Sequence, residues 1–240
     1  DHGKSISEPT WIYVREALNF YKKHKPAFIL VEIDSPGGEV FAAQKISDAL
    51  YEIATQDQIP TVAFINNWAI SAGAMIAYSC QYIVTSQDGS MGAAEPVIQG
   101  GEGGMQTASE KINSALRTDF ANRAALYGRN PLIAEAMVDK DLMIVARNGN
   151  IIKLRSDEEL KDKGRDKDII IIEKGKLLTL TAQQMLDWDI ANSRVSADKS
   201  FSRELNQGKT VLVKETPLKE IDSFQEVLDT PVRHFELDWR

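Results

Sequence analysis

The short apolar run at residues 28–33 constrains the fold of this chain more than any other feature. It reads Phe-Ile-Leu-Val-Glu-Ile, and a nearly unbroken apolar run of this length is typical of a strand covered on both faces, as in parallel sheets. Residues 61–65 and 80–84 repeat the pattern, and apolar residues recur at helical spacing over residues 42–53. Strands that alternate with helices predict an α/β fold built on a parallel sheet.

Continuous apolar runs and apolar residues at helical spacing also divide the rest of the chain into expected strands and helices. Helices are expected at 11–22, 108–127, 131–139 and 181–188, and β-like runs at 142–145, 151–154 and 169–172. Residues 142–180 are therefore predicted to form a β-rich excursion, and the glycine-rich residues 97–107 a mobile loop. We expect one domain over residues 1–195, followed by a polar C-terminal extension at 196–240.

The composition excludes several classes of function. Asp and Glu number 35 against 28 Lys and Arg, and no basic cluster is present, so a nucleic-acid-binding surface is not expected. No apolar run approaches the roughly 20 residues that cross a bilayer. The lone cysteine, Cys80, lies in an apolar stretch and is predicted to be a small core residue.

The first motif that could take part in a reaction is Asp34-Ser35-Pro36-Gly37-Gly38, which follows the first buried strand. Proline fixes one φ angle, and paired glycines allow backbone conformations that other residues avoid. Such a loop can present bare N–H groups to a ligand oxygen, as an oxyanion hole does. An ordinary strand-to-helix turn explains the glycines equally well when they are taken alone.

The second motif places Ser71 directly after the second buried strand, within Ile70-Ser71-Ala72-Gly73-Ala74. A serine at this point exposes its Oγ at the sheet edge, and the Ala72 N–H points the same way. The start of a helix favours a developing anion, and the small neighbours allow a substrate backbone to approach. A helix N-cap is the common alternative use of such a serine.

Lys111, near the start of the predicted helix at 108–127, is the third candidate. It lies beside Ile112 and one turn before Ala115, at the margin of the apolar stripe that Leu116 and Phe120 continue, so we expect it to be partly buried. Burial lowers a lysine pKa from about 10.4 by up to 3–5 units, as a general base near neutral pH requires. A lysine that extends from the surface into solvent is the alternative.

The positions of the three histidines limit the mechanism. His2 and His234 lie near the ends and His24 in a basic turn, so a Ser-His-Asp triad is hard to build. A Ser-Lys pair is the natural replacement. No cluster of His, Asp or Glu has the spacing of metal ligands, and we expect neither a metal nor a cofactor.

Taken together, six stretches resemble the NfeD-type membrane-bound serine proteases, whose Clp-protease-like domain is encoded beside stomatin homologues. The stretches are Ile33–Val40, Ala69–Ala77, Gly89–Val97, Glu110–Asn113, Tyr127–Asn130 and Lys176–Ala182. They occur in the order of the family and cover roughly residues 10–195. Any one of them alone is weak, and the ordered set is specific.

The resemblance implies roles for individual residues. Ser71 matches the nucleophile, Lys111 matches the base some forty residues later, and the amides of Gly38 and Ala72 match the oxyanion hole. Gly37 and Gly73, which flank these amides, are expected to contact the substrate.

The resemblance also implies a fold and partners. It predicts a Clp-protease- or crotonase-like βα spiral and a homo-oligomer. The implied activity is cleavage of apolar peptide segments of membrane-associated proteins, with the tail of a stomatin-like protein as the suspected substrate. Residues 235–240 look like the approach to the family's first transmembrane helix. This predicts a membrane-anchored protein with the domain on the extracytoplasmic side.

One departure and three alternatives stay open at this point. Many relatives carry His-Pro where this chain has Glu95-Pro96, and a carboxylate near Lys111 would raise the lysine pKa and weaken the base. A signal-peptide-peptidase-A-like protease shares the fold and the Ser-Lys chemistry, but its lysine usually lies farther from the serine. A catalytically silent scaffold would bind a stomatin-type partner through the same groove. An acyl-CoA enzyme of the crotonase group would leave Ser71 and Lys111 without roles.

Overall fold

A computed structural model describes residues 3–99 and 104–194 of the chain. The chain forms two compact units. The first unit comprises the residues up to Ser90 together with those from Thr181 onward, and the second unit is Met91–Leu180. Each unit is described by itself.

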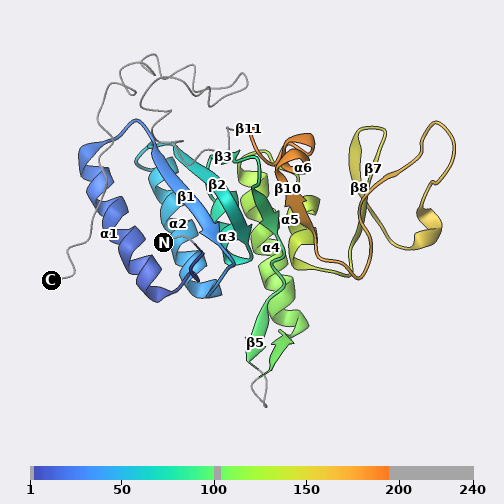
Figure 1. Ribbon diagram of the computed structural model, residues 1–240, viewed down its shortest axis with the longest axis horizontal. Coiled ribbons are helices and arrows are strands. Elements are labelled where there is room, and N and C mark those ends of the chain that lie inside the picture. Colours follow the sequence, from blue (N-terminus) through green and yellow to red (C-terminus); the bar gives the residue numbers. More distant parts are fainter. Residues whose placement is uncertain (1–2, 100–103, 195–240) are drawn as a thin grey trace. The chain divides into compact units, whose positions relative to one another are not determined.

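The first unit is an α/β layer structure (Figure 1). Its elements are α1 (Glu8–His24), β1 (Ile29–Ser35), α2 (Val40–Thr55), β2 (Thr61–Ile70), α3 (Ala72–Tyr78), β3 (Tyr82–Thr85), α6 (Ala182–Asp187) and β11 (Ser193–Arg194). β1 pairs with β2, β2 with β3, and β3 with β11, and every one of these pairings is parallel. The parallel sheet predicted from the continuous apolar runs is confirmed.

The core of this unit follows from the two periodicities. Ile46, Leu50 and Ile53 of α2 are fully buried, and they recur at the three- and four-residue intervals of one helix face. Apolar residues at the centre of the sheet are covered as well, with Ile65 and Ile83 at 0% exposure. Leu30 and Val31 of β1 are half-buried, and Trp68 of β2 is exposed. Cys80 is buried and forms no disulfide among the described residues, as expected for a small core residue.

The second unit combines two helices with small antiparallel sheets. Its elements are β5 (Val97–Gln99), β6 (Met105–Thr107), α4 (Glu110–Leu126), α5 (Pro131–Val138), β7 (Met143–Arg147), β8 (Asn150–Leu154), a 3-10 turn at Asp157–Glu159, and β9 (Ile169–Ile172). The short strands β4 (Ser90–Gly92) and β10 (Thr179–Thr181) lie where the chain passes from one unit to the other. α4 and α5 pack against each other.

The β-rich excursion predicted at residues 142–180 is present. β7 is its central strand, and β8 and β9 pair antiparallel on either side of it. The charged loop that follows β8 is closed by an ion pair, in which Arg147 Nε and Nη2 donate to the two carboxylate oxygens of Asp168 at 2.6 and 2.7 Å. These bonds hold the pKa of Asp168 at about 2, well below the usual 3.8, and the backbone N–H of Lys161 adds to the effect.

Two expectations about local structure are wrong. The glycine-rich stretch is not simply a loop, because β5 and β6 pair antiparallel from Val97↔Thr107 to Gln99↔Met105 and form a hairpin. β2 does not end near Ile65 but continues to Ile70. In both places short or polar strands carry too few apolar residues to give a periodic signal.

Residues 195–240 lie outside the part that the structure describes, and so do the predicted extension and the predicted approach to a membrane segment. The domain boundary at residue 195 therefore stays a prediction. Among the described residues, every helix is too short or too polar to cross a bilayer.

Candidate active site

The Pro-Gly-Gly loop after β1 is held in place by the segment that precedes α1. Ile6 N–H donates to the Gly37 carbonyl, and Glu39 N–H donates to the Ile6 carbonyl, each at 2.8 Å. The Ser35 hydroxyl donates to the Lys4 carbonyl at 2.8 Å. Successive backbone groups of an extended chain point to opposite sides. The Gly37 carbonyl and the Glu39 N–H both face Ile6. The N–H of Gly38, which lies between them, therefore points away from Ile6.

Ser71 has a backbone conformation that is rare for a residue with a side chain. It joins β2 to α3 with φ 55° and ψ −116°, outside the regions that most residues occupy. Its hydroxyl makes no capping hydrogen bond to α3. The N-cap role is therefore excluded as the reason for a serine at this position. Strained strand-to-helix turns of this kind present nucleophiles in other enzymes.

The structure brings Gly37 directly against Ser71. A Cβ added at Gly37 would lie 2.6 Å from Ser71 Cβ and 3.2 Å from Ser71 Oγ. Gly37 has φ +116°, which a side chain rarely adopts. Only glycine therefore allows the loop to approach the serine this closely, so the first two motifs of the sequence meet at one place.

The two predicted oxyanion-hole amides are free to donate in the described part of the chain. Ala72 is the first residue of α3, where helix N–H groups have no intrahelical acceptor. No acceptor for the Gly38 N–H occurs among the described residues. Gly73 is different, because a Cβ added there would meet Ile33 at 3.5 Å and Ser35 O at 3.7 Å. Gly73 thus packs toward β1, and its contact with substrate stays a prediction.

A bulge in β2 sets the position of Ser71, and the sequence did not reveal it. Ile33 pairs with Ile65 and Ser35 pairs with Ala69, so three residues of β2 stand opposite one residue of β1. Carboxylates of β1 hold this bulge. Asn66 Nδ2 donates to Glu32 at 2.7 Å, and Trp68 N–H donates to Asp34 at 3.4 Å. The polar residues Asn66 and Asn67, which follow the apolar run of β2, were the feature of the sequence that could have indicated this bulge.

Lys111 lies in the first turn of α4, in the second unit, and its side chain is exposed rather than partly buried as predicted. The predicted helical stripe is right at Leu116 and Phe120 and wrong at Ile112 and Ala115, which are exposed. Ile112 is 45% exposed, whereas Asn113, Leu116 and Phe120 are buried. Residues 113, 116 and 120 follow the three- and four-residue spacing of one face, and Lys111 lies outside it.

Glu95, the residue expected to complicate the base, contacts another lysine. Its Oε1 lies 2.8 Å from Lys140 Nζ. The hydrogen bond to Glu95 raises the pKa of Lys140, because it stabilises the ammonium form. Lys140 is for this reason a poor general base, and the Glu95 carboxylate is engaged by Lys140.

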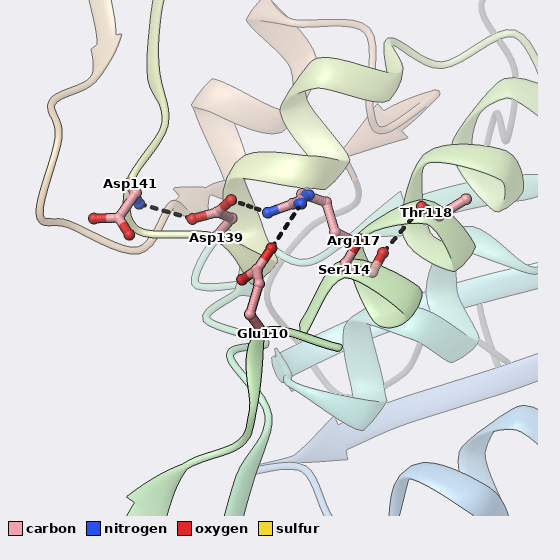
Figure 2. A network of polar contacts seen from close by, with 6 residues as sticks. All are labelled: Glu110, Ser114, Arg117, Thr118, Asp139 and Asp141. Atoms are coloured by element: carbon pink, nitrogen blue, oxygen red, sulfur yellow. Dashed lines mark hydrogen bonds and ion pairs between the residues drawn. The ribbon is translucent and has the colours of Figure 1, made fainter. Parts of the chain in front are cut away.

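A polar network joins the start of α4 to the end of α5 (Figure 2). Arg117 donates to Asp139 through Nη1 and to Glu110 through Nη2, the latter at 3.3 Å. Asp139 also accepts a hydrogen bond from the Asp141 N–H at 2.8 Å. These charged residues are scattered over thirty positions of the sequence, and their interaction was not predicted.

The predicted residues therefore fall into two groups. Ser71, Gly37, Gly38 and Ala72 lie together in the first unit, and Lys111 lies in the second. The pairing of Ser71 with Lys111 stays a prediction. In the described ranges no group of three or more His, Cys, Asp or Glu is arranged to hold a metal ion.

Comparison with known proteins identifies relatives over most of the described chain. Residues 4–163 match the family described as NfeD1b, N-terminal domain. The membrane protein NfeD1b of Bacillus subtilis (strain 168) is 29% identical over 161 residues, which are 66% of this chain and 35% of that protein. A Synechocystis sp. (strain PCC 6803) protein, named as a candidate protease, is 31% identical over 96 residues, 40% of this chain and 34% of that protein. The chain spans about a third of the length of these curated relatives.

Solved structures share the fold. A serine-to-alanine mutant of the membrane-bound stomatin-specific protease 1510-N has a TM-score of 0.61 at 21% identity, over 85% of this chain and 79% of that chain. A lysine-to-alanine mutant of 1510-N in complex with a substrate peptide has a TM-score of 0.61 at 18% identity, over 95% and 96%. ClpP1 from Listeria monocytogenes has a TM-score of 0.50 at 15% identity, over 81% and 89%. The Clp-protease-like α/β fold is confirmed.

Proposed function

The chain belongs to the NfeD1b family, whose N-terminal domain it matches over residues 4–163, and from this membership we propose that it is a serine peptidase with Ser71 as nucleophile and Lys111 as general base. The observation that carries the proposal is the strained Ser71 turn, with φ 55° and a hydroxyl that caps no helix. Gly37 approaches this serine to a distance that only glycine permits. A serine held this way at a structural cost needs a role beyond packing.

In the proposed reaction the Ser71 Oγ attacks the carbonyl carbon of a peptide bond. Neutral Lys111 takes the hydroxyl proton and returns it to the leaving amine. The N–H groups of Gly38 and Ala72 donate to the oxyanion that forms. Water then hydrolyses the acyl-enzyme by the reverse route.

The choice of Lys111 as base rests on spacing and on the alternative lysine. The serine and the lysine replaced in the two 1510-N mutants lie about forty residues apart in that protein, and Lys111 likewise follows Ser71 by forty. Lys140 is held in its ammonium form by Glu95. Lys111 is engaged by no carboxylate among the described residues.

We further propose the partners that the relatives suggest. The substrate is an apolar segment of a membrane-associated protein, with the tail of a stomatin-like protein as the first candidate, because 1510-N is a stomatin-specific membrane-bound protease. The domain acts as a homo-oligomer on the extracytoplasmic side of a membrane, to which other parts of the protein anchor it.

A fluorophosphonate probe tests the reaction, because an activated serine Oγ attacks its phosphorus, forms a phosphonate ester and releases fluoride. We expect covalent labelling at Ser71, identified by peptide mass spectrometry, and its loss in Ser71→Ala and in Lys111→Ala. Lys140→Ala is the matched control, and its labelling should continue. Labelling that survives Lys111→Ala, or that depends on Lys140 instead, would remove Lys111 from the mechanism.

The second candidate function is a catalytically silent domain that binds a stomatin-type partner. The exposure of Lys111 favours it, because an exposed side chain is what an ordinary surface lysine shows. Under this alternative the folded protein binds the partner's tail without labelling by the probe and without cleavage.

A further inference from the structure

The first turn of α4 is not capped by its own side chains. Ser109 occupies the N-cap position without a side-chain hydrogen bond. The Ser109 carbonyl accepts from the N–H groups of Ile112 and Asn113, at 2.9 and 3.0 Å. A helix end that lacks a capping side chain unwinds more easily. Another contact is needed if this turn is to be well ordered.

The network of Figure 2 supplies that contact. Glu110 is the first residue of α4, and its carboxylate accepts from Arg117 Nη2 two turns farther along the same helix. The other guanidinium nitrogen, Nη1, is bound to Asp139 at the end of α5. Arg117 therefore links the first turn of α4 to a point outside the helix.

The anchor of this link is well fixed. The Asp139 side chain is only 9% exposed, and its second carboxylate oxygen accepts from the Asp141 N–H at 2.8 Å. Arg117 is 22% exposed, whereas Glu110 is 74% exposed. An isolated surface pair such as Glu110–Arg117 contributes little, but a shared guanidinium bound to a buried carboxylate restricts both partners.

We propose that Arg117, anchored by Asp139, is a positioning residue that orders the first turn of α4 through Glu110 and so sets the place of Lys111. The consequence for catalysis rests on the proposed function, because Lys111 is a base only in that mechanism. Arg117 itself acts on no substrate. A base must lie within hydrogen-bond reach of the proton it accepts, and a displacement of about 1 Å can cost about 100-fold in rate.

Three variants test the proposal. Glu110→Ala removes the link at the exposed end and leaves Arg117–Asp139 intact, so the fold is retained. Asp139→Asn keeps an oxygen for the Asp141 N–H but weakens the anchor. Glu110→Gln keeps an acceptor for Arg117 and is the conservative variant. Glu173→Ala is the matched control, because Glu173 forms an exposed pair with Lys176 elsewhere in the second unit.

Two readouts separate positioning from stability. Hydrogen exchange at the amides of Ile112 and Asn113, followed by NMR, reports the order of the turn without requiring activity. The rate constant of fluorophosphonate labelling at Ser71 reports the base, whereas the labelled fraction reports how much protein is folded. We expect exchange to rise about threefold in Glu110→Ala and by up to the same factor in Asp139→Asn, because Arg117 reaches the turn through Glu110. The labelling rate should fall by similar factors at an unchanged labelled fraction, and Glu110→Gln should lie close to the wild type.

The outcomes decide between the two proposals. Unchanged exchange in both Glu110→Ala and Asp139→Asn refutes the positioning role, as does raised exchange with an unchanged labelling rate. The same change in Glu173→Ala would show that the effect is not specific to this network, and it also refutes the role. If the wild type is not labelled at all, the peptidase proposal fails, and exchange alone then decides whether Arg117 orders the turn.

Discussion

Replacement of Gly37 by alanine tests most directly whether the loop and Ser71 form one site. The added Cβ would lie 2.6 Å from Ser71 Cβ. Non-bonded carbon atoms approach to about 3.5–4.0 Å, so the loop and the serine must separate by about 1 Å. The φ of +116° at Gly37 adds a backbone strain of about 1–3 kcal/mol for a residue with a side chain.

These numbers predict a small effect of Gly37→Ala on the free energy of unfolding and a large effect on the reaction rate of Ser71. The free energy of unfolding should fall by about 1–3 kcal/mol, which a folded domain of this size tolerates. The reaction of Ser71 should suffer far more, because a displacement of about 1 Å in a reacting group costs about 100-fold in rate. Gly37→Ala is thus expected to remain folded and to lose most of its reactivity.

The assay compares the rate constant of fluorophosphonate labelling with the urea unfolding curve of the same sample. Gly164→Ala is the control, because Gly164 has φ +90° and no atom lies within 4 Å of its added Cβ. This control has the backbone strain without the clash. Labelling of Gly37→Ala at the wild-type rate would refute the inference that Gly37 sets the position of Ser71.

The remaining predictions concern the stability of the second unit. The pKa of Asp168 is about 2 in the folded state against an ordinary 3.8, because of Arg147, so its ionised carboxylate stabilises the fold above about pH 4, and this contribution is lost as the pH falls toward 2. Asp168→Asn should therefore show a shallower loss of stability over that interval in urea unfolding, and parallel curves for the two proteins would contradict the assignment. Phe120→Ala should destabilise by about 3–5 kcal/mol and Ile112→Ala by less than about 0.5 kcal/mol, because only Phe120 is buried. Equal thermal shifts would mean that the buried face of α4 is wrongly placed.

Local pattern was sufficient for the central elements of the first unit. The runs at 28–33 and 61–65 are strands β1 and β2, and the turn that follows each of them is where the sequence placed a ligand-facing loop and a serine. A buried parallel strand has apolar residues on both faces, and this leaves a signal that needs no knowledge of distant residues.

The apolar pattern did not predict correctly which face of helix α4 is buried. Leu116 and Phe120 were predicted to be buried on α4 and are buried. Ile112 and Ala115 were predicted on the same stripe but are exposed, and Asn113 lies on the buried face in their place. Asn113 is polar and was not counted as a core residue. A helix with apolar residues on two adjacent faces gives no decisive period, and the face that packs depends on what α5 offers.

The sequence by itself determined the α/β class, the order of the central helices and strands, and the type of residue at each turn of the candidate site, because periodicity and glycine usage are local properties. Tertiary structure alone decided that Gly37 touches Ser71 and that the Ser71 hydroxyl caps no helix. It also decided that Glu95 is bound by Lys140 and that Arg117 joins α4 to α5. These contacts join residues far apart in the chain, and their geometry depends on how strands and helices pack rather than on the neighbours of each residue in the sequence.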